Sequence, residues 1–264
     1  MGYGLDGGIE HTVGNTKTIE AAILPFLMCN DAKLVDGKVV GDPTEGALLV
    51  LGHKAKVDTE GTQELYPRLA TLPFDPTYKF MAVFCQTTAD DGKPVVRVFV
   101  KGAGPAVIAR VTSALADGKS VPWTDDATQR ANTQMERLGG KGLRVMAAAM
   151  KDIDASTFDP DGDLLALIDD LEMTALVGMI DPPRKESMDA VRDAQAANIR
   201  VRMVTGDDVV TGAAVAKQLG IPGEAILGTE LAAMSEAERL ERIDGIGVVG
   251  RVAPEHKVLM VDTL

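Results

Sequence analysis

Apolar and basic side chains alternate over residues 199–204, which read IRVRMV. Side chains of a strand point alternately to its two faces, so this pattern predicts a β-strand. A Thr-Gly-Asp turn follows at 205–207, and the spacing of apolar residues over 208–219 predicts a helix that a Gly-Ile-Pro sequence ends. A turn between the end of a strand and the start of a helix offers free backbone N–H groups to phosphate. Such turns also end many strands that bind nothing, so the tripeptide alone leaves both interpretations open.

The sequence around this strand alternates between predicted strands and helices. Residues 173–180 are almost continuously apolar, which is typical of a strand covered on both faces. A helix is predicted over 185–197, and strands near 225–227 and 248–250 flank a helix near 235–243. This βαβα order predicts an α/β domain with a parallel sheet.

Before residue 175 the pattern is richer in hairpins, with Asp-Gly turns between short β-branched runs. The predicted elements are a helix over 16–31, a hairpin over 33–41, strands over 82–85, 95–100 and 143–150, and helices over 106–115 and 126–139. The change of pattern places a domain boundary near residue 175.

Composition narrows the class of protein. A chain of 264 residues can bury the core of one large or two ordinary domains. No run approaches the roughly 18 to 20 apolar residues of a membrane helix, so we expect the chain itself to be soluble. The net charge of -12 argues against nucleic-acid binding, although a few local cations suffice for a nucleotide. Cys29 and Cys85 lie in apolar segments and are expected to be free core thiols.

Two segments carry residue types that suit a ligand site. Pro43 and Thr44 suit the start of a helix, with Thr44 able to cap it, and Glu45 lies where the helix dipole favours an anion. Glu45 therefore either contacts a ligand or only stabilises the helix. Lys101 ends a predicted strand beside Gly102, so ammonium and backbone could approach a ligand together. A solvated lysine before a helix explains the same residues equally well.

Eight short motifs follow one another along most of the chain. They are CND at 29–31, DPTEGALL at 42–49, the segment 74–81, KGA at 101–103, GLR at 142–144, DPPR at 181–184, MVTGD at 203–207 and RVAPEHK at 251–257. By these motifs the chain resembles the cytoplasmic part of a P-type cation-transporting ATPase, closest in pattern to the calcium-pump-like group. Each motif is weak alone, and their common order and spacing carry the resemblance.

The resemblance implies a fold of the α/β (α+β) class with two domains. Residues 1–175 would form a nucleotide-binding domain, built as an antiparallel sheet with flanking helices. Residues 176–264 would form part of a phosphorylation domain with the Rossmann-like, haloacid-dehalogenase-type fold. The implied activity is ATP hydrolysis through an aspartyl phosphate, coupled to cation transport, with this chain on the cytoplasmic side of the membrane.

The resemblance also implies a nucleotide site. Glu45 would contact the adenine amino group, Phe74 would stack on the adenine ring, and Lys79 and Lys101 would line the pocket near base and phosphates. Arg144 would meet the β-phosphate, in keeping with the affinity of cations for phosphate. The other implied nucleotide-binding residues are Gly102 beside Lys101, Asp181 and Arg184 at the domain junction, and Arg251 near the hinge or phosphate.

A second implied site would serve phosphoryl transfer, which chiefly requires alignment and neutralisation of charge. Thr205 and Gly206 would hydrogen-bond the transferring phosphoryl oxygens, and Lys257 would neutralise the developing charge. Asp207 would fix the turn or bind ribose.

The chain departs from the family pattern in several places. Pro76 stands where an arginine is frequent and Pro105 where a glutamate is usual, and both are expected to weaken ATP binding without abolishing it. The DKTGT motif of the phosphorylated aspartate and the GDGxND motif of the magnesium-binding aspartates do not occur. We therefore expect a fragment that binds ATP without turnover. The Mg²⁺ ligands, the rest of the phosphorylation domain, the actuator domain and the transmembrane domain would lie elsewhere in the parent pump.

Two other functions fit parts of the sequence. A free-standing phosphatase of the haloacid-dehalogenase type would need an aspartate nucleophile, and the DxD candidates Asp159 and Asp161 lie in a polar loop. A calcium loop at 159–163 is rejected, because Leu164 stands where glycine is needed and no glutamate closes the loop. A non-catalytic nucleotide-binding module differs from a pump fragment only in what accompanies it.

Overall fold

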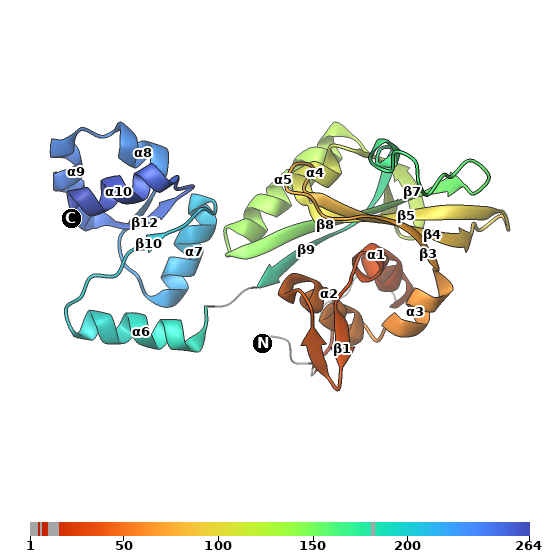
Figure 1. Cartoon of the computed structure of the whole chain (residues 1–264), viewed down its shortest axis with the longest axis horizontal. Coiled ribbons are helices and arrows are strands. Elements are labelled where there is room, and N and C mark those ends of the chain that lie inside the picture. The colour runs from red at the N-terminus through yellow and green to blue at the C-terminus, as the bar shows by residue number, and fades with distance from the viewer. Residues whose placement is uncertain (1–4, 6, 10–15, 181–182) are drawn as a thin grey trace. The chain divides into compact units, whose positions relative to one another are not determined.

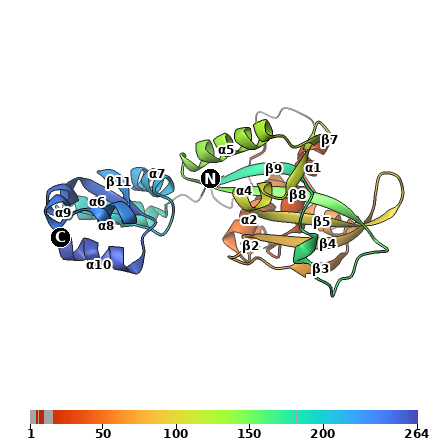
Figure 2. The same cartoon turned by 90° about the horizontal axis from the view of Figure 1, so that it is seen from above.

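The computed structural model of the chain describes residue 5 and residues 7–9, 16–180 and 183–264. Contacts divide the chain into two compact units, which Figure 1 and Figure 2 show from two directions. The first unit comprises residues 1–135 and 145–179, and the second comprises residues 136–144 and 180–264.

Among the described residues, a seven-stranded sheet forms the centre of the first unit. Its strands in spatial order are β3 (Arg68–Leu72), β4 (Phe80–Thr88), β5 (Pro94–Ala103), β8 (Leu143–Asp154), β9 (Leu171–Ile180), β6 (Val111–Ala116) and β7 (Lys119–Pro122). The strands predicted over 82–85, 95–100, 143–150 and 173–180 all lie within these longer strands. The strand over 173–180 was expected in the parallel sheet of the α/β domain, but it belongs to the sheet of the first unit instead. β4 and β5 form an antiparallel hairpin that pairs Phe80 with Gly102 and Met81 with Lys101.

Helices cover both faces of this sheet, as Figure 1 shows. They are α1 (Thr16–Met28), α2 (Pro43–Lys54), α3 (Thr59–Leu65), α4 (Gly104–Ile108) and α5 (Asp125–Gly139), with a short 3-10 turn at Leu165–Leu167. Phe80 and Phe84 of β4 pack in one core cluster with α4 and α5, whereas Met81 and Val83 pack in another with α1. Successive residues of a strand face opposite sides, so both faces of β4 are buried and its sequence is a continuous apolar run.

The sheet of the first unit is mixed, which corrects the expectation of an antiparallel sheet. β6 and β9 run parallel, with Val111 paired to Leu171. Between these two strands the chain passes through β7, α5 and β8, and a parallel pair requires such a long connection. The mixed class with helices and sheets is otherwise as expected.

The helix predicted over residues 106–115 is wrong in its second half. The helix α4 ends at Ile108, and β6 begins at Val111 because the Arg110 carbonyl oxygen accepts the Leu171 N–H at 2.8 Å. β6 then turns into β7 through Asp117 and Gly118, whose φ angles of 49° and 76° both suit a two-residue hairpin. The predicted hairpin of β1 (Lys33–Val35) and β2 (Lys38–Val40) is confirmed.

Both cysteines are free and buried, as expected. Burial raises the pKa of Cys29 to about 12 and that of Cys85 to about 11. In the unfolded chain a thiol ionises near pH 8.5. Between pH 8.5 and these higher values the unfolded state therefore loses protons that the folded state keeps, and the free energy of unfolding falls as pH rises.

We expect Cys29→Ala to remove part of this alkaline destabilisation. Between pH 8 and 10 the wild type should lose about 2 kcal/mol more free energy of unfolding than the variant, since one thiol contributes up to about 1.4 kcal/mol per pH unit. Urea unfolding at both pH values measures the difference. The smaller side chain of alanine lowers stability by the same amount at pH 8 and at pH 10. Equal pH dependence of the wild type and the variant would therefore contradict the raised pKa of Cys29.

The described part of the second unit contains a three-stranded parallel sheet in the order β10 (Met203–Val204), β12 (Ile246–Gly250), β11 (Glu224–Leu227). Its helices are α6 (Lys185–Ala196), α7 (Val209–Leu219), α8 (Gly228–Ala233), α9 (Glu236–Arg242) and α10 (Pro254–Thr263), with a 3-10 turn at Ile243–Gly245. In the ranges that the structure describes, every helix is too short or too polar to cross a membrane.

The strand predicted over residues 199–204 is shorter than expected. Only the two residues of β10 pair with β12. Asn198 adopts a positive φ of 59°, and the Ile199 N–H returns to the Ala194 carbonyl oxygen at 2.9 Å. This is the pattern of a helix C-terminus. The first residues of the predicted strand therefore terminate α6 instead.

Candidate functional site

The helix α2 presents Glu45 in its first turn. Asp42 caps the helix, because its Oδ1 accepts the N–H groups of Thr44 at 2.8 Å and Glu45 at 3.2 Å, and Pro43 follows it. Burial opposes the charge of Asp42, but the N–H groups of Glu45 and Thr44 outweigh it and lower the pKa of this carboxyl. Asp42 is thus the capping residue, and the expectation of Thr44 in that role is wrong.

The carboxylate of Glu45 forms a largely buried ion pair with Lys101 of β5. Lys101 Nζ lies 2.6 Å from Glu45 Oε1, and the two side chains are 7% and 16% exposed. Glu45 Oε2 accepts the N–H groups of Asp31 at 2.9 Å and Ala32 at 3.2 Å. Both oxygens of the carboxylate are therefore hydrogen-bonded, which a buried charge requires.

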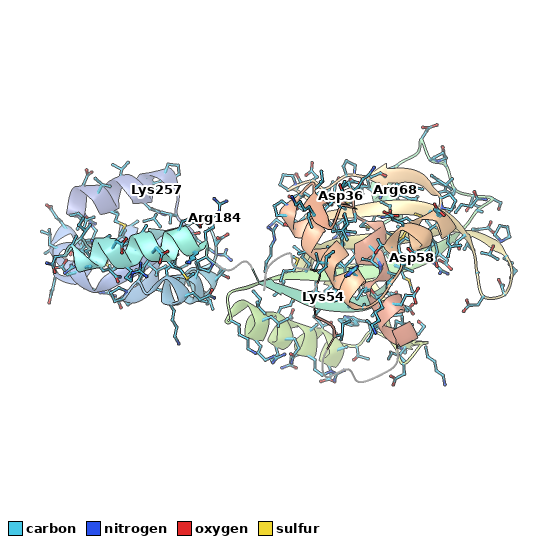
Figure 3. All side chains as sticks on the ribbon, turned by 90° about the horizontal axis from the view of Figure 1, so that it is seen from below. Asp36, Lys54, Asp58, Arg68, Arg184 and Lys257 are labelled. Atoms are coloured by element: carbon cyan, nitrogen blue, oxygen red, sulfur yellow. The ribbon has the colours of Figure 1, made fainter. Side chains whose placement is uncertain are left out.

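The turn after α1 completes this polar network. Asn30 is 3% exposed, and its Nδ2 donates to the Glu45 carbonyl oxygen at 2.9 Å. Arg68 of β3, labelled in Figure 3, pairs with Asp31 at 2.8 Å and donates to the carbonyl oxygens of Met28 and Asn30. Asn30, Asp31 and Arg68 are not among the site residues that the sequence predicts. The available signals were the CND motif at 29–31, which contains Asn30 and Asp31, and the position of this polar pair at the end of an apolar helix.

The loop before β4 joins the same strand end. The Lys79 carbonyl oxygen accepts the Ala103 N–H at 2.9 Å, and Lys79 has a positive φ of 61°. A Cβ atom at Gly102 would lie 2.6 Å from the Lys79 carbonyl oxygen and 2.7 Å from the Phe80 Cα. The glycine therefore permits close backbone contact. In the same loop, Phe74 is 60% exposed.

The motifs CND, DPTEG and KGA thus meet in the first unit. The loop that contains Phe74 and Lys79 is hydrogen-bonded to the KGA motif through Ala103. Arg144 lies exposed at the start of β8, in the segment 136–144 that groups with the second unit. Its contact with a phosphate stays a prediction.

In the second unit the Thr-Gly-Asp turn lies at the carboxyl ends of parallel strands. Thr205 Oγ1 donates to Asp207 Oδ2 at 3.1 Å and accepts the Asp207 N–H at 3.0 Å. The Arg251 N–H donates to the Asp207 carbonyl oxygen at 2.8 Å, and its guanidinium pairs with Asp208 at 3.1 Å. The structure therefore brings Arg251 together with Thr205 and Asp207, although Arg251 comes from a different motif.

The other predicted residues of the second unit lie at its surface. A Cβ atom built at Gly206 would meet no heavy atom within 4 Å, so this backbone is open to a ligand. Lys257 on α10 and Arg184 directly before α6 are exposed, and Figure 3 labels both. Asp181 lies outside the described residues.

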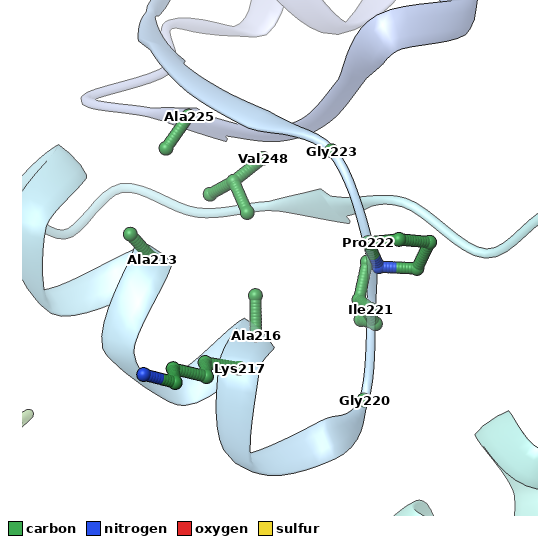
Figure 4. Close-up of a pocket in the computed structure, with 9 residues that line it drawn as sticks. All are labelled: Ala213, Ala216, Lys217, Gly220, Ile221, Pro222, Gly223, Ala225 and Val248. Atoms are coloured by element: carbon green, nitrogen blue, oxygen red, sulfur yellow. The ribbon is translucent and has the colours of Figure 1, made fainter.

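A cavity of about 400 Å³ in the second unit holds none of the predicted residues (Figure 4). It is lined mostly by small apolar side chains and by the loop 220–223, which enters β11. Ligands of parallel sheets bind at the carboxyl ends of strands, so this cavity does not mark the site. Among the described residues, no group of three or more His, Cys, Asp or Glu side chains could hold a metal ion.

The match to a known protein family tests the resemblance that these motifs indicate. Residues 18–186 match the family model described as P-type ATPase, cytoplasmic domain N. The chain belongs to this P-type ATPase family. The matched region includes Glu45, Phe74, Lys79, Lys101 and Arg144, so the resemblance drawn from the short motifs is confirmed.

Relatives of the P-type ATPase domain extend over nearly the whole chain. A calcium-transporting ATPase 1 of Lactococcus lactis is 35% identical over 89% of the chain and 26% of its own length. The cation-transporting ATPase pma1 of Synechocystis is 36% identical over 95% of the chain and 28% of its length. The human calcium-transporting ATPase type 2C member 1 is 31% identical over 98% of the chain and 27% of its own length. The chain thus spans about a quarter of the length of these relatives. Their names do not favour the alternative hypothesis of a free-standing phosphatase.

Proposed function

We propose that this P-type ATPase chain is the ATP-binding part of a pump that couples ATP hydrolysis, through an aspartyl phosphate, to cation transport. The ion pair of Glu45 and Lys101 carries the proposal. It joins two residues that lie 56 positions apart, in two motifs inside the region that matches the family model. Relatives named as calcium-transporting or cation-transporting ATPases support the transport function.

In the proposed nucleotide site, Phe74 provides an exposed ring on which adenine stacks. Glu45 accepts a hydrogen bond from the adenine amino group through a carboxylate already fixed by Lys101 and two backbone N–H groups. Lys79 and Lys101 supply positive charge near the base and phosphates. Gly102 keeps the two strands close enough to hold these lysines on adjacent segments.

The proposed nucleotide site also includes arginine side chains near the phosphates. Arg144 meets the β-phosphate, and Arg184, with Asp181, positions the nucleotide. Arg251 supports the Thr-Gly-Asp turn, in keeping with its contacts to Asp207 and Asp208.

We assign phosphoryl transfer to the turn of the second unit. Thr205 and Gly206 donate hydrogen bonds to the phosphoryl oxygens, and Lys257 neutralises their charge. Asp207 holds the Thr205 hydroxyl in place, as their two hydrogen bonds indicate. Residues 1–175 act as the nucleotide-binding domain and 176–264 as part of a haloacid-dehalogenase-like phosphorylation domain.

Other parts of the parent protein complete the proposed pump. The phosphorylated aspartate, the actuator domain and the transmembrane domain are its partners, with this chain on the cytoplasmic side of the membrane. Mg²⁺ would screen the ATP phosphates when bound. The described residues do not form a cluster suited to this ion, so we derive no step through it.

Calorimetric titration with ATP and GTP tests the proposed function. We expect adenine-selective binding with a Kd of tens of micromolar to millimolar, or roughly -6 to -4 kcal/mol. A parallel assay of phosphate release should show no steady hydrolysis. A folded protein that binds neither nucleotide, or one that turns ATP over after rigorous purification, would contradict the proposal.

A further inference from the structure

The loop of residues 73–79 is closed by a hydrogen bond beside Phe74. Tyr78 donates its hydroxyl proton to the Pro73 carbonyl oxygen at 2.7 Å. The carbonyl of Pro73 and the N–H of Phe74 belong to one planar peptide unit. Fixing the oxygen therefore fixes the plane that leads to the Phe74 Cα, while Phe74 as a residue stays 60% exposed.

Further hydrogen bonds hold the other side of this loop. Asp75 Oδ1 accepts the Thr77 N–H at 2.7 Å, and the Asp75 carbonyl oxygen accepts the Lys79 N–H at 2.7 Å. The Lys79 carbonyl oxygen is in turn bound to the Ala103 N–H of β5. The loop is therefore ordered by its own contacts and by its attachment to the strand that carries Lys101.

The donor of the closing hydrogen bond is itself held by the core. The ring of Tyr78 packs against Phe80, with 4.8 Å between centroids, and Phe80 is completely buried. The Arg110 guanidinium lies 4.9 Å from the centroid of the same Phe80 ring. Burial and then the charge of Asp75 raise the pKa of Tyr78, so its hydroxyl keeps its proton to a higher pH than that of an ordinary tyrosine.

The loop also contains two prolines, Pro73 and Pro76, whose rings restrict the backbone further. A surface aromatic ring on a fixed backbone loses less conformational entropy when a flat ligand stacks on it.

We propose that Tyr78 is a positioning residue for the nucleotide base, acting on Phe74 through the Pro73 carbonyl group. This inference rests on the proposed function, because it requires adenine to stack on Phe74. Tyr78 itself touches no ligand, and its hydroxyl determines the orientation of the stacking ring.

Tyr78→Phe removes the hydroxyl and keeps the ring that packs on Phe80. By calorimetry, we expect this variant to bind ATP and adenosine about 3-fold to 10-fold more weakly, the effect of one lost hydrogen bond. Inorganic tripolyphosphate, which has no base, should change by less than about 2-fold. Tyr66→Phe is the matched control. Its ring packs against Phe99 at 5.4 Å, and it should bind all three ligands like the wild type.

A double-mutant cycle separates positioning from general structural damage. In a Phe74→Ala background, Tyr78→Phe should leave the Kd for ATP unchanged, because no ring remains to be positioned. A similar loss with tripolyphosphate, or an undiminished effect without Phe74, would overturn the inference. If Tyr78→Phe binds ATP like the wild type, the inference alone fails. If the folded wild type binds no ATP, the proposed function fails with it.

Discussion

Gly102→Ala is expected to lower the free energy of unfolding of the first unit by about 3 kcal/mol. A Cβ atom at this position would lie 2.6 Å from the Lys79 carbonyl oxygen and 2.7 Å from the Phe80 Cα. Both atoms belong to backbone that is hydrogen-bonded to β5, so neither can move without breaking the pairing. Urea unfolding monitored by circular dichroism measures the change.

Gly104→Ala is the matched control, two residues along the chain. Its added Cβ would meet the Met135 Sδ, which belongs to a flexible side chain that can move aside. We expect a loss of about 1 kcal/mol, which Met135→Ala should largely relieve at this site. If Gly102→Ala were as stable as the wild type, β4 and β5 would not approach each other as closely as described.

Lys101→Met is expected to cost about 3 kcal/mol, because it leaves the carboxylate of Glu45 buried without its cation. The side chain of Glu45 is only 16% exposed, so water can replace little of the lost interaction. The two N–H groups from Asp31 and Ala32 remain, which limits the loss. Chemical denaturation of the single variant gives the value.

The double variant Glu45→Gln, Lys101→Met isolates the charge effect. The amide oxygen of glutamine can still accept the two backbone N–H groups, and neither charge is left buried. More than half of the stability lost in Lys101→Met should therefore return, whereas ATP binding should stay weak in both variants. Equal stability of the single and double variants would argue against a buried ion pair.

Local patterns predicted the central elements of the fold correctly. The Asp91-Gly92 turn and its β-branched flanks identify the hairpin of β4 and β5, because these signals lie within about ten residues of one another. The β6–β7 hairpin was missed, since residues 106–115 also fit helical spacing. The deciding hydrogen bond joins Arg110 and Leu171, which lie 61 positions apart in the sequence. The mixed sheet depends on this same long-range pairing.

The candidate site could be predicted only residue by residue. The helix-start signals drew attention to Glu45 and the strand end drew attention to Lys101, but each also had a purely structural explanation. Their ion pair depends on how α2 packs and on the register of β5, neither of which a local pattern contains. Asn30 is buried for the same long-range reason. Motif order identified the family where local chemistry left the function open.

The most direct test of the account is an NMR titration of the isotope-labelled chain with ATP. In the proposed site the adenine base lies in the first unit, against Glu45, Phe74, Lys79 and Lys101. Backbone amide signals of residues 30–32, 44–46, 74–79 and 101–103 should therefore shift together and saturate with one Kd. Shifts confined to the second unit, or no saturable shifts in a folded chain, would contradict the central claim that this network forms the ATP site.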